Sequence, residues 1–363
     1  ELEVLGKGSP VIYINGRKVH NMNELKQMRS EEVQNVEVIT NPGAQYDAAV
    51  SSVVRIRTVR RDGEGFGFDL NAANNQDLQN GVSDPSATLN LRYRFRDLDL
   101  FGSVNYWKWD QISVYYDYAK MYTGRDSYIL EDCVANDHFY SSGLDYNMGF
   151  NWQLSQNHSV GARIVRRTTI DAGTYYSSTT DIIRYDESSG QVSSVNESFQ
   201  DEKRHSPYDW EGNVYYSGMV GRLGINFNAD YLSNRKDMMC SISDVIDAEE
   251  YMERFQEGVT TSRLAAAKLV LTYPVWKGQL EAGTEVTSVE RGSSYSITNY
   301  PLPASDSEVD ENNVSAFVSY GFSLPKFGSV SAGLRYEHVG FNYTDLLDDA
   351  NSMDRYQDEF FPS

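Results

Sequence analysis

From residue 63 onward, apolar and polar residues alternate over runs of ten or more positions, as in 85–95, 143–152 and 313–324. Successive side chains of a β-strand point to opposite faces, so each run predicts a strand with one apolar and one polar face. Strands of soluble proteins average about 5–6 residues, whereas a tilted membrane-spanning strand needs about 9–11. A soluble sandwich also alternates, but the length of these runs favours a transmembrane β-barrel.

The connections between the predicted strands alternate between short and long. The short ones are 96–97, 155–158, 219–221, 276–278 and 326–328, and the long ones fall near 124–137, 171–205, 236–259, 293–311 and 342–358. Aromatic residues stand beside the short turns, namely Tyr93, Phe95, Trp152, Tyr273, Trp276 and Phe322. Short turns on one rim, long polar loops on the other and an aromatic girdle are typical of outer-membrane barrels.

The alternating segments number about 11. They lie near 63–75, 85–95, 97–123, 138–153, 159–170, 207–218, 222–235, 260–274, 278–292, 312–324 and 328–343. Closed single-chain bacterial barrels have an even number of strands, and plugged transporters have about 22. We therefore predict a mainly β fold, in which residues 63–363 form the N-terminal half of an antiparallel transmembrane β-barrel in the cell outer membrane.

Residues 1–62 follow a different pattern, which predicts a small α/β unit before the barrel. The expected elements are strands at 11–14, 36–40 and 53–60 and a short helix near 23–28. Asn15-Gly16 is a strong signal for a tight turn after the first strand. At Asn41-Pro42-Gly43 proline fixes φ and glycine permits positive φ, so this tripeptide predicts a chain reversal.

Three motifs of this unit resemble a known family. They are Val11-Ile12-Tyr13-Ile14-Asn15-Gly16, then Glu31-Glu32-Val33 continuing to Val36-Glu37-Val38-Ile39-Thr40-Asn41-Pro42-Gly43-Ala44-Gln45-Tyr46-Asp47, and Val53-Val54-Arg55-Ile56-Arg57-Thr58. Together they resemble the C-terminal half of the plug domain of TonB-dependent receptors, most closely in the Bacteroidetes outer membrane beta-barrel family. Leu100-Phe101-Gly102-Ser103 and the terminal Phe360-Phe361-Pro362-Ser363 also look like that family's barrel. Residues 48–52 depart from it, because they lack the glycine usual after the Tyr-Asp pair.

The resemblance implies a receptor and transporter whose extracellular loops and plug bind a scarce nutrient and import it into the periplasm. Energy would come from the TonB complex through a segment outside this sequence, which we interpret as a fragment. The other expected partners are outer-membrane lipid, lipopolysaccharide and an unidentified nutrient. Siderophore, glycan, peptide and cobalamin cargoes all remain open. The alternative is a surface adhesin or protein-binding barrel without active transport.

Two groups of residues are candidate site residues. The plug turn motif comprises Asn41, Pro42, Gly43, Tyr46 and Asp47, and we interpret it as structural rather than as a ligand contact. The plug basic stripe comprises Arg55, Arg57, Arg60 and Arg61. Residues 63–363 hold 44 acidic and 23 basic residues, so the stripe is predicted to form ion pairs with an acidic barrel wall. Solvation of these arginines in a water-filled lumen is the alternative.

Several functions are disfavoured by composition and spacing. A net charge of −20 argues against nucleic acid as a partner, because a phosphate backbone attracts a basic face. The five histidines show no metal-ligand spacing, and no Gly-x-Ser-x-Gly motif occurs. We therefore predict no catalytic residues, no metal site, no cofactor and no enzymatic activity. Cys133 and Cys240 fall in predicted outer loops, and their pairing stays open.

Overall fold

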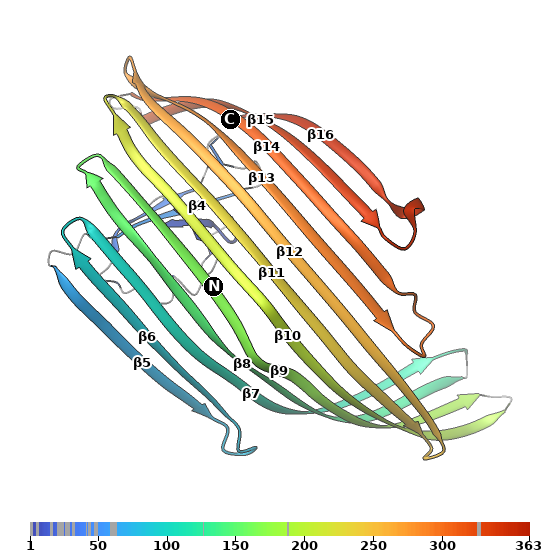
Figure 1. Ribbon diagram of the computed structural model, residues 1–363. Helices are drawn as coiled ribbons and strands as arrows, with labels where there is room; N and C mark the ends of the chain where they lie inside the picture. The colour runs from blue at the N-terminus through green and yellow to red at the C-terminus, as the bar shows by residue number, and fades with distance from the viewer. Residues whose placement is uncertain are drawn as a thin grey trace.

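The chain folds into two β-sheets, seen in the computed structural model (Figure 1). The structure describes residues 3–4, 7–14, 17–19, 25, 30, 33–40, 42, 45–46, 50–58, 64–125, 127–186, 189–324 and 328–363, and the statements below concern these residues. The helix expected near 23–28 falls almost entirely outside them.

The larger sheet is antiparallel and has twelve strands in sequence order, with β5 and β16 at its two edges. The strands are β5 (Gly65–Gln76), β6 (Ser83–Phe95), β7 (Leu98–Tyr122), β8 (Tyr128–Ser155), β9 (His158–Asp186), β10 (Gly190–Val220), β11 (Leu223–Ile246), β12 (Glu250–Val275), β13 (Gly278–Ile297), β14 (Ser305–Leu324), β15 (Gly328–Asp345) and β16 (Met353–Pro362). The predicted mainly β, antiparallel architecture is therefore confirmed. Among the described residues no helix is long and apolar enough to cross a membrane.

The strand count exceeds the predicted eleven by one, and the additional strand is β16. Most of the segment that precedes Phe360 in this strand is polar, so period-two alternation gives no clear signal there. It nevertheless pairs with β15 from Tyr343↔Met353 to Leu334↔Pro362. A turn around the short 3₁₀ helix η2 (Asp349–Asn351) joins the two strands.

The predicted long loops are wrong, because most of their residues continue the strands as paired hairpins. Strand β10 is 31 residues long and β9 is 29, so the described residues of the segment 171–205 are all strand except Ser189. Pairing of β10 with β11 likewise continues out to Asn196↔Ile246. The distal parts of β7 to β10 bend away from the direction of the other strands (Figure 1). The predicted short turns at 96–97, 155–158, 219–221 and 276–278 are confirmed to within two residues, whereas most of the turn predicted at 326–328 lies outside the described residues.

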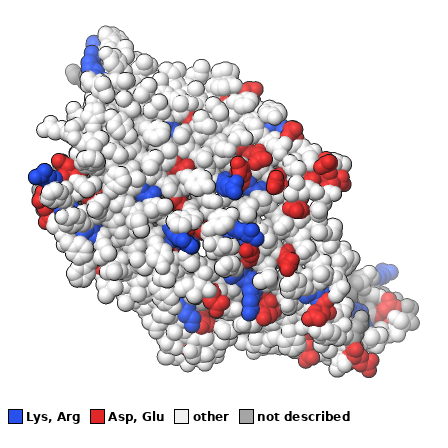
Figure 2. All heavy atoms as spheres, in the orientation of Figure 1, with Lys and Arg blue, Asp and Glu red and all other residues white. Residues whose placement is uncertain are grey.

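The register separates the large sheet into two faces. One face, called the outer face below, carries the apolar alternating positions, such as Met148 opposite Ile164 and Val214 opposite Ala229. The girdle aromatics Tyr93, Phe95, Trp152, Tyr273 and Phe322 all occupy this face close to the short turns. Figure 2 shows a largely uncharged surface over the strands next to these turns, with a few charged groups at its outer edge, and mixed acidic and basic groups toward the distal hairpins. This distribution matches the apolar band of a membrane barrel.

The smaller sheet has the strand order β2-β1-β4-β3. Its strands are β1 (Val11–Ile14), β2 (Arg17–Lys18), β3 (Val33–Ile39) and β4 (Val53–Thr58), and β1 runs parallel to β4. Ile12, Ile14, Val54 and Ile56 form its apolar core. Burying each such side chain contributes about 1.5–3 kcal/mol, so this small sheet has a core of its own.

Candidate functional site

The candidate site is the contact between the small sheet and the polar face of the large sheet, called the inner face below. On the small sheet it centres on Tyr46, which is 6% exposed. The Tyr46 ring lies 5.9 Å from the Tyr13 ring, and its hydroxyl accepts a hydrogen bond of 2.9 Å from Nε of Arg55. Burial raises the pKa of both tyrosines, and Arg55 partly opposes the shift of the Tyr46 pKa. Both phenols are therefore neutral at physiological pH.

Arg55 makes its ion pair within the small sheet. Its guanidinium lies 3.6 Å from the Glu37 carboxylate, across the β3–β4 pairing, and 5.7 Å from the centre of the Tyr46 ring. The two ionic side chains are 36% and 52% exposed, so water screens their attraction. Arg55 thus orients Tyr46 and neutralises Glu37 in its own sheet.

Lys268, which projects from β12, is a cation that contacts the segment between β3 and β4. Its Nζ donates a 2.5 Å hydrogen bond to the backbone oxygen of Gln45 and lies 5.6 Å from the centre of the Tyr46 ring. The same ammonium forms a 3.1 Å ion pair with Glu285 on β13. Because the Lys268 side chain is only 19% exposed, these contacts are stronger than those of a surface lysine.

Glu285 continues the network into the wall of the large sheet. Its carboxylate lies 3.6 Å from Arg335 on β15, and Arg335 pairs with Glu337 at 2.5 Å. The Arg335 side chain is only 3% exposed. The register explains the cluster, because Lys268 lies opposite Glu285, Glu285 opposite Ser315 and Ser315 opposite Glu337. Four adjacent strands therefore place Lys268, Glu285 and Glu337 in one cross-strand row, and Arg335 lies beside this row between the two carboxylates.

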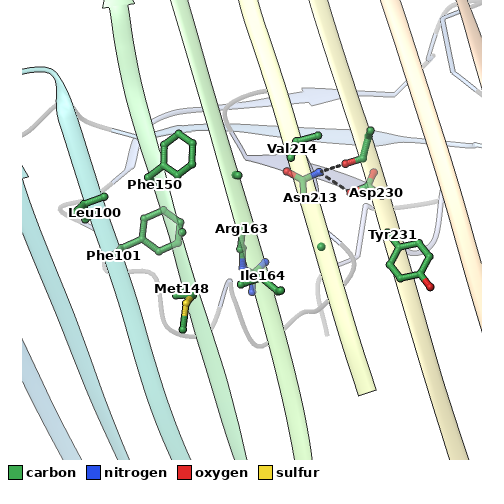
Figure 3. A pocket seen from close by; sticks show the side chains of 14 residues that line it. Leu100, Phe101, Met148, Phe150, Arg163, Ile164, Asn213, Val214, Asp230 and Tyr231 are labelled. Carbon is green, nitrogen blue, oxygen red and sulfur yellow. Dashed lines mark hydrogen bonds between the residues drawn. The ribbon is translucent and has the colours of Figure 1, made fainter. Parts of the chain in front are cut away.

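A second polar cluster occupies the inner face of β9, β10 and β11. Arg167 contacts Glu211 at 2.7 Å and Asp209 at 3.0 Å, and Arg163 lies 3.9 Å from Glu211. Asn213 donates hydrogen bonds to Asp230 and to the backbone oxygen of Ala229 (Figure 3). Both arginines and their carboxylate partners are matched inside the wall, so this part of the inner face is polar and its arginines are neutralised locally.

The structure brings only some of the predicted site residues into this contact. From the plug turn motif, Tyr46 takes part and Pro42 is half-buried, whereas Asn41, Gly43 and Asp47 lie outside the described residues. From the basic stripe, Arg55 takes part and Arg57 is exposed opposite Asn35, whereas Arg60 and Arg61 lie outside the described residues. The predicted pairing of the stripe with the wall stays a prediction for Arg60 and Arg61.

Sequence reasoning missed the wall residues of the contact. Lys268 interrupts the apolar run Ala265–Val270, and Glu285 and Arg335 occupy polar positions of alternating strands. A charged residue at a polar position of an alternating strand indicates a side chain that faces the lumen. The sequence could not show which residue it would contact there. Cys133 and Cys240, whose pairing the sequence left open, are free thiols on β8 and β11.

Replacing Lys268 with methionine is expected to loosen the small sheet while leaving the large sheet intact. The change removes a hydrogen bond from a charged donor, which is worth about 1.5–3 kcal/mol. Amides of β4 should then exchange with deuterium roughly 10-fold to 100-fold faster by mass spectrometry. The matched control is Lys277→Met, at an exposed turn where the ammonium lies over Trp276. Unchanged exchange in β4 would show that Lys268 does not hold the sheet.

Comparison with known proteins supports the barrel architecture. Residues 222–363 match the model of a family described as the outer membrane protein beta-barrel family. No curated protein matches the chain. The chain is a protein of the cell outer membrane, as the alternation and the girdle predict.

Several solved structures are similar at low identity. The siderophore receptor PiuA from Acinetobacter baumannii is 10% identical, with 96% of this chain and 64% of PiuA covered and a TM-score of 0.36. The ferric yersiniabactin uptake receptor FyuA from Yersinia pestis is 11% identical, with 98% and 70% covered and a TM-score of 0.31. The outer membrane protease OmpT from Escherichia coli is 13% identical, with 71% and 92% covered and a TM-score of 0.25. At these sequence identities and TM-scores, the similarity assigns no activity to this chain.

Proposed function

We propose that this chain is part of a TonB-dependent outer-membrane receptor that binds a scarce nutrient and imports it into the periplasm. Residues 1–62 are the C-terminal half of its plug, and residues 63–363 are the N-terminal half of its barrel, as in the Bacteroidetes family that the plug motifs resemble. The protein binds and gates its cargo and catalyses no reaction. Its energy comes from the TonB complex, acting through a segment outside this sequence.

The observation that carries this proposal is the position of the small sheet against the inner face, held through Lys268, Gln45 and Tyr46. A wide barrel needs a plug, because its lumen would otherwise be an open aqueous channel. The contact is suited to release because it is polar. When the small sheet moves, water can solvate Lys268 and Glu285.

The proposal is tested by growth of cells that depend on the intact full-length protein. The cells receive iron-siderophore, cobalamin, peptide or glycan as the sole source of the limiting nutrient. We expect rescue by one class of nutrient and loss of that rescue when TonB is deleted. A strain carrying an unrelated, TonB-independent porin serves as the control. Rescue that persists without TonB, or no rescue by any class, would contradict import and favour a protein-binding surface barrel.

A further inference from the structure

The outer face of β8 to β11 carries an apolar groove of about 710 Å³ (Figure 3). Two rows of residues that lie opposite one another across the strands outline it. One row is Met148, Ile164, Gly212 and Tyr231, and the other is Phe150, Ala162, Val214 and Ala229. Small residues at the centre of both rows form the floor, and longer apolar side chains form the sides.

Gly212 leaves the floor of the groove uncovered. A Cβ atom built at Gly212 has no heavy atom within 4 Å, so nothing in the described structure packs over this backbone. The strand glycine Gly149, on the inner face, is different, because a Cβ there would lie 2.6 Å from the ring of Phe101. The neighbouring ring fills the space over Gly149, whereas the space over Gly212 is open to an outside occupant.

A cation lies at the end of the groove that points away from the short turns. Arg166 is exposed two positions beyond Ile164, on the same face, and its guanidinium lies 4.8 Å from the centre of the Trp210 ring. Among the described residues it has no carboxylate within ion-pair distance, whereas Arg163 and Arg167 on the inner face both do. The register places Tyr146 and Trp210 on either side of Arg166.

We propose that this face binds one molecule of lipid A, with an acyl chain in the groove over Gly212 and a phosphate on Arg166. The protein lies in the outer membrane, so the outer face meets lipid, and an exposed arginine beside an apolar groove complements an anionic lipid headgroup. The choice of lipid A rests on the orientation in the proposed function, in which the distal hairpins are extracellular and Arg166 lies on the side of the outer leaflet. Tyr146 and Trp210 are suited to the interface between acyl chains and headgroups.

The test measures lipid retained by the full-length protein after extraction from outer membranes and purification in mild detergent. Native mass spectrometry should find about one lipid A per wild-type protein. Gly212→Leu fills the groove and Arg166→Gln removes the cation, and each should lower the retained lipid A about fivefold or more. The matched controls are Ala316→Leu, on the outer face of β14, and Arg263→Gln, in the same cross-strand row as Arg166 but paired with Glu290. Both should retain lipid A as the wild type does.

Equal retention by Gly212→Leu, Arg166→Gln and the controls would overturn the proposal, and so would a glycerophospholipid in place of lipid A. The measurement needs neither nutrient nor TonB, so its outcome is independent of import. A protein that retains lipid A but fails the growth test would contradict the proposed function alone. A protein that imports its nutrient but retains no lipid A would contradict the lipid site alone.

Discussion

Cross-linking residue 45 to residue 268 is expected to abolish nutrient uptake by the intact protein. In the structure Nζ of Lys268 donates a 2.5 Å hydrogen bond to the backbone oxygen of Gln45, and this bond ties the segment between β3 and β4 to the wall. If import requires the small sheet to leave the wall, a covalent bridge at this point blocks it whatever the cargo. Uptake should fall to the level of cells without the receptor.

The experiment begins with Cys133→Ser and Cys240→Ser, which remove the two free thiols. Gln45→Cys and Lys268→Cys are then added and joined by a thiol reagent with a short cleavable spacer, because Lys268 spans the gap with a long side chain. Radiolabelled nutrient uptake is measured before bridging, after bridging and after cleavage of the spacer. We expect uptake before bridging, none after bridging and a return to the unbridged level of the same variant after cleavage.

The matched control pairs Gln45→Cys with Ala267→Cys. Ala267 is the neighbour of Lys268 on β12 and points to the outer face, so the strand itself separates it from the small sheet. This pair should not cross-link, and uptake should be unaffected by the reagent. Undiminished uptake by protein that is fully bridged between residues 45 and 268 would rule out the release of this contact as part of import.

Replacing Arg335 with leucine is expected to lower the free energy of unfolding by about 3–5 kcal/mol. Arg335 is 2% exposed and lies between Glu285 and Glu337. Its removal leaves two carboxylates together in the wall without their shared cation, and Lys268 then neutralises only Glu285. Urea unfolding of the protein in lipid vesicles, followed by tryptophan fluorescence, measures the loss.

Arg263→Leu is the control, because Arg263 and Glu290 form an ion pair whose side chains are 64% and 56% exposed. An exposed pair of this kind contributes at most about 1 kcal/mol. The double variant Arg335→Leu with Glu337→Gln should recover part of the stability, since it removes one of the unpaired charges. Equal effects of Arg335→Leu and Arg263→Leu would show that burial does not strengthen the inner network.

Most of the arrangement of the large sheet could be predicted, because period-two alternation is a direct consequence of strand geometry. It identified the girdle residues, such as Trp152 and Tyr273, and the short turns that they accompany. The prediction failed for the segments outside the membrane, which were expected to be long loops. Beyond the membrane both faces of a strand meet water, so segments such as 171–205 remain paired strands without an apolar face and resemble loops in sequence.

The candidate site could be predicted only in part. Tyr46 and Arg55 were identified because they belong to local motifs of the small sheet. Lys268 is 223 positions away from Gln45 in sequence, and no local pattern links the two residues. The positions of the β-bulges could not be predicted from the sequence either. One lies in the β8–β9 pairing, where the register shifts by a residue between Ser142 and Gly143. A shift of one residue exchanges the faces of a strand, so the sequence alone could not place the residues of β9 that follow the bulge, from Asp171 onward.

The sequence by itself determined that the chain forms antiparallel strands with one apolar face, and it predicted a small unit over residues 1–62 before them. Those properties depend on the order of residues along each strand. Only the tertiary structure decided which charges meet, because Lys268, Glu285 and Arg335 come together through pairing across four strands and through contact with the second sheet. Cross-strand register and sheet-to-sheet contact are set by packing over the whole molecule, which local sequence does not encode.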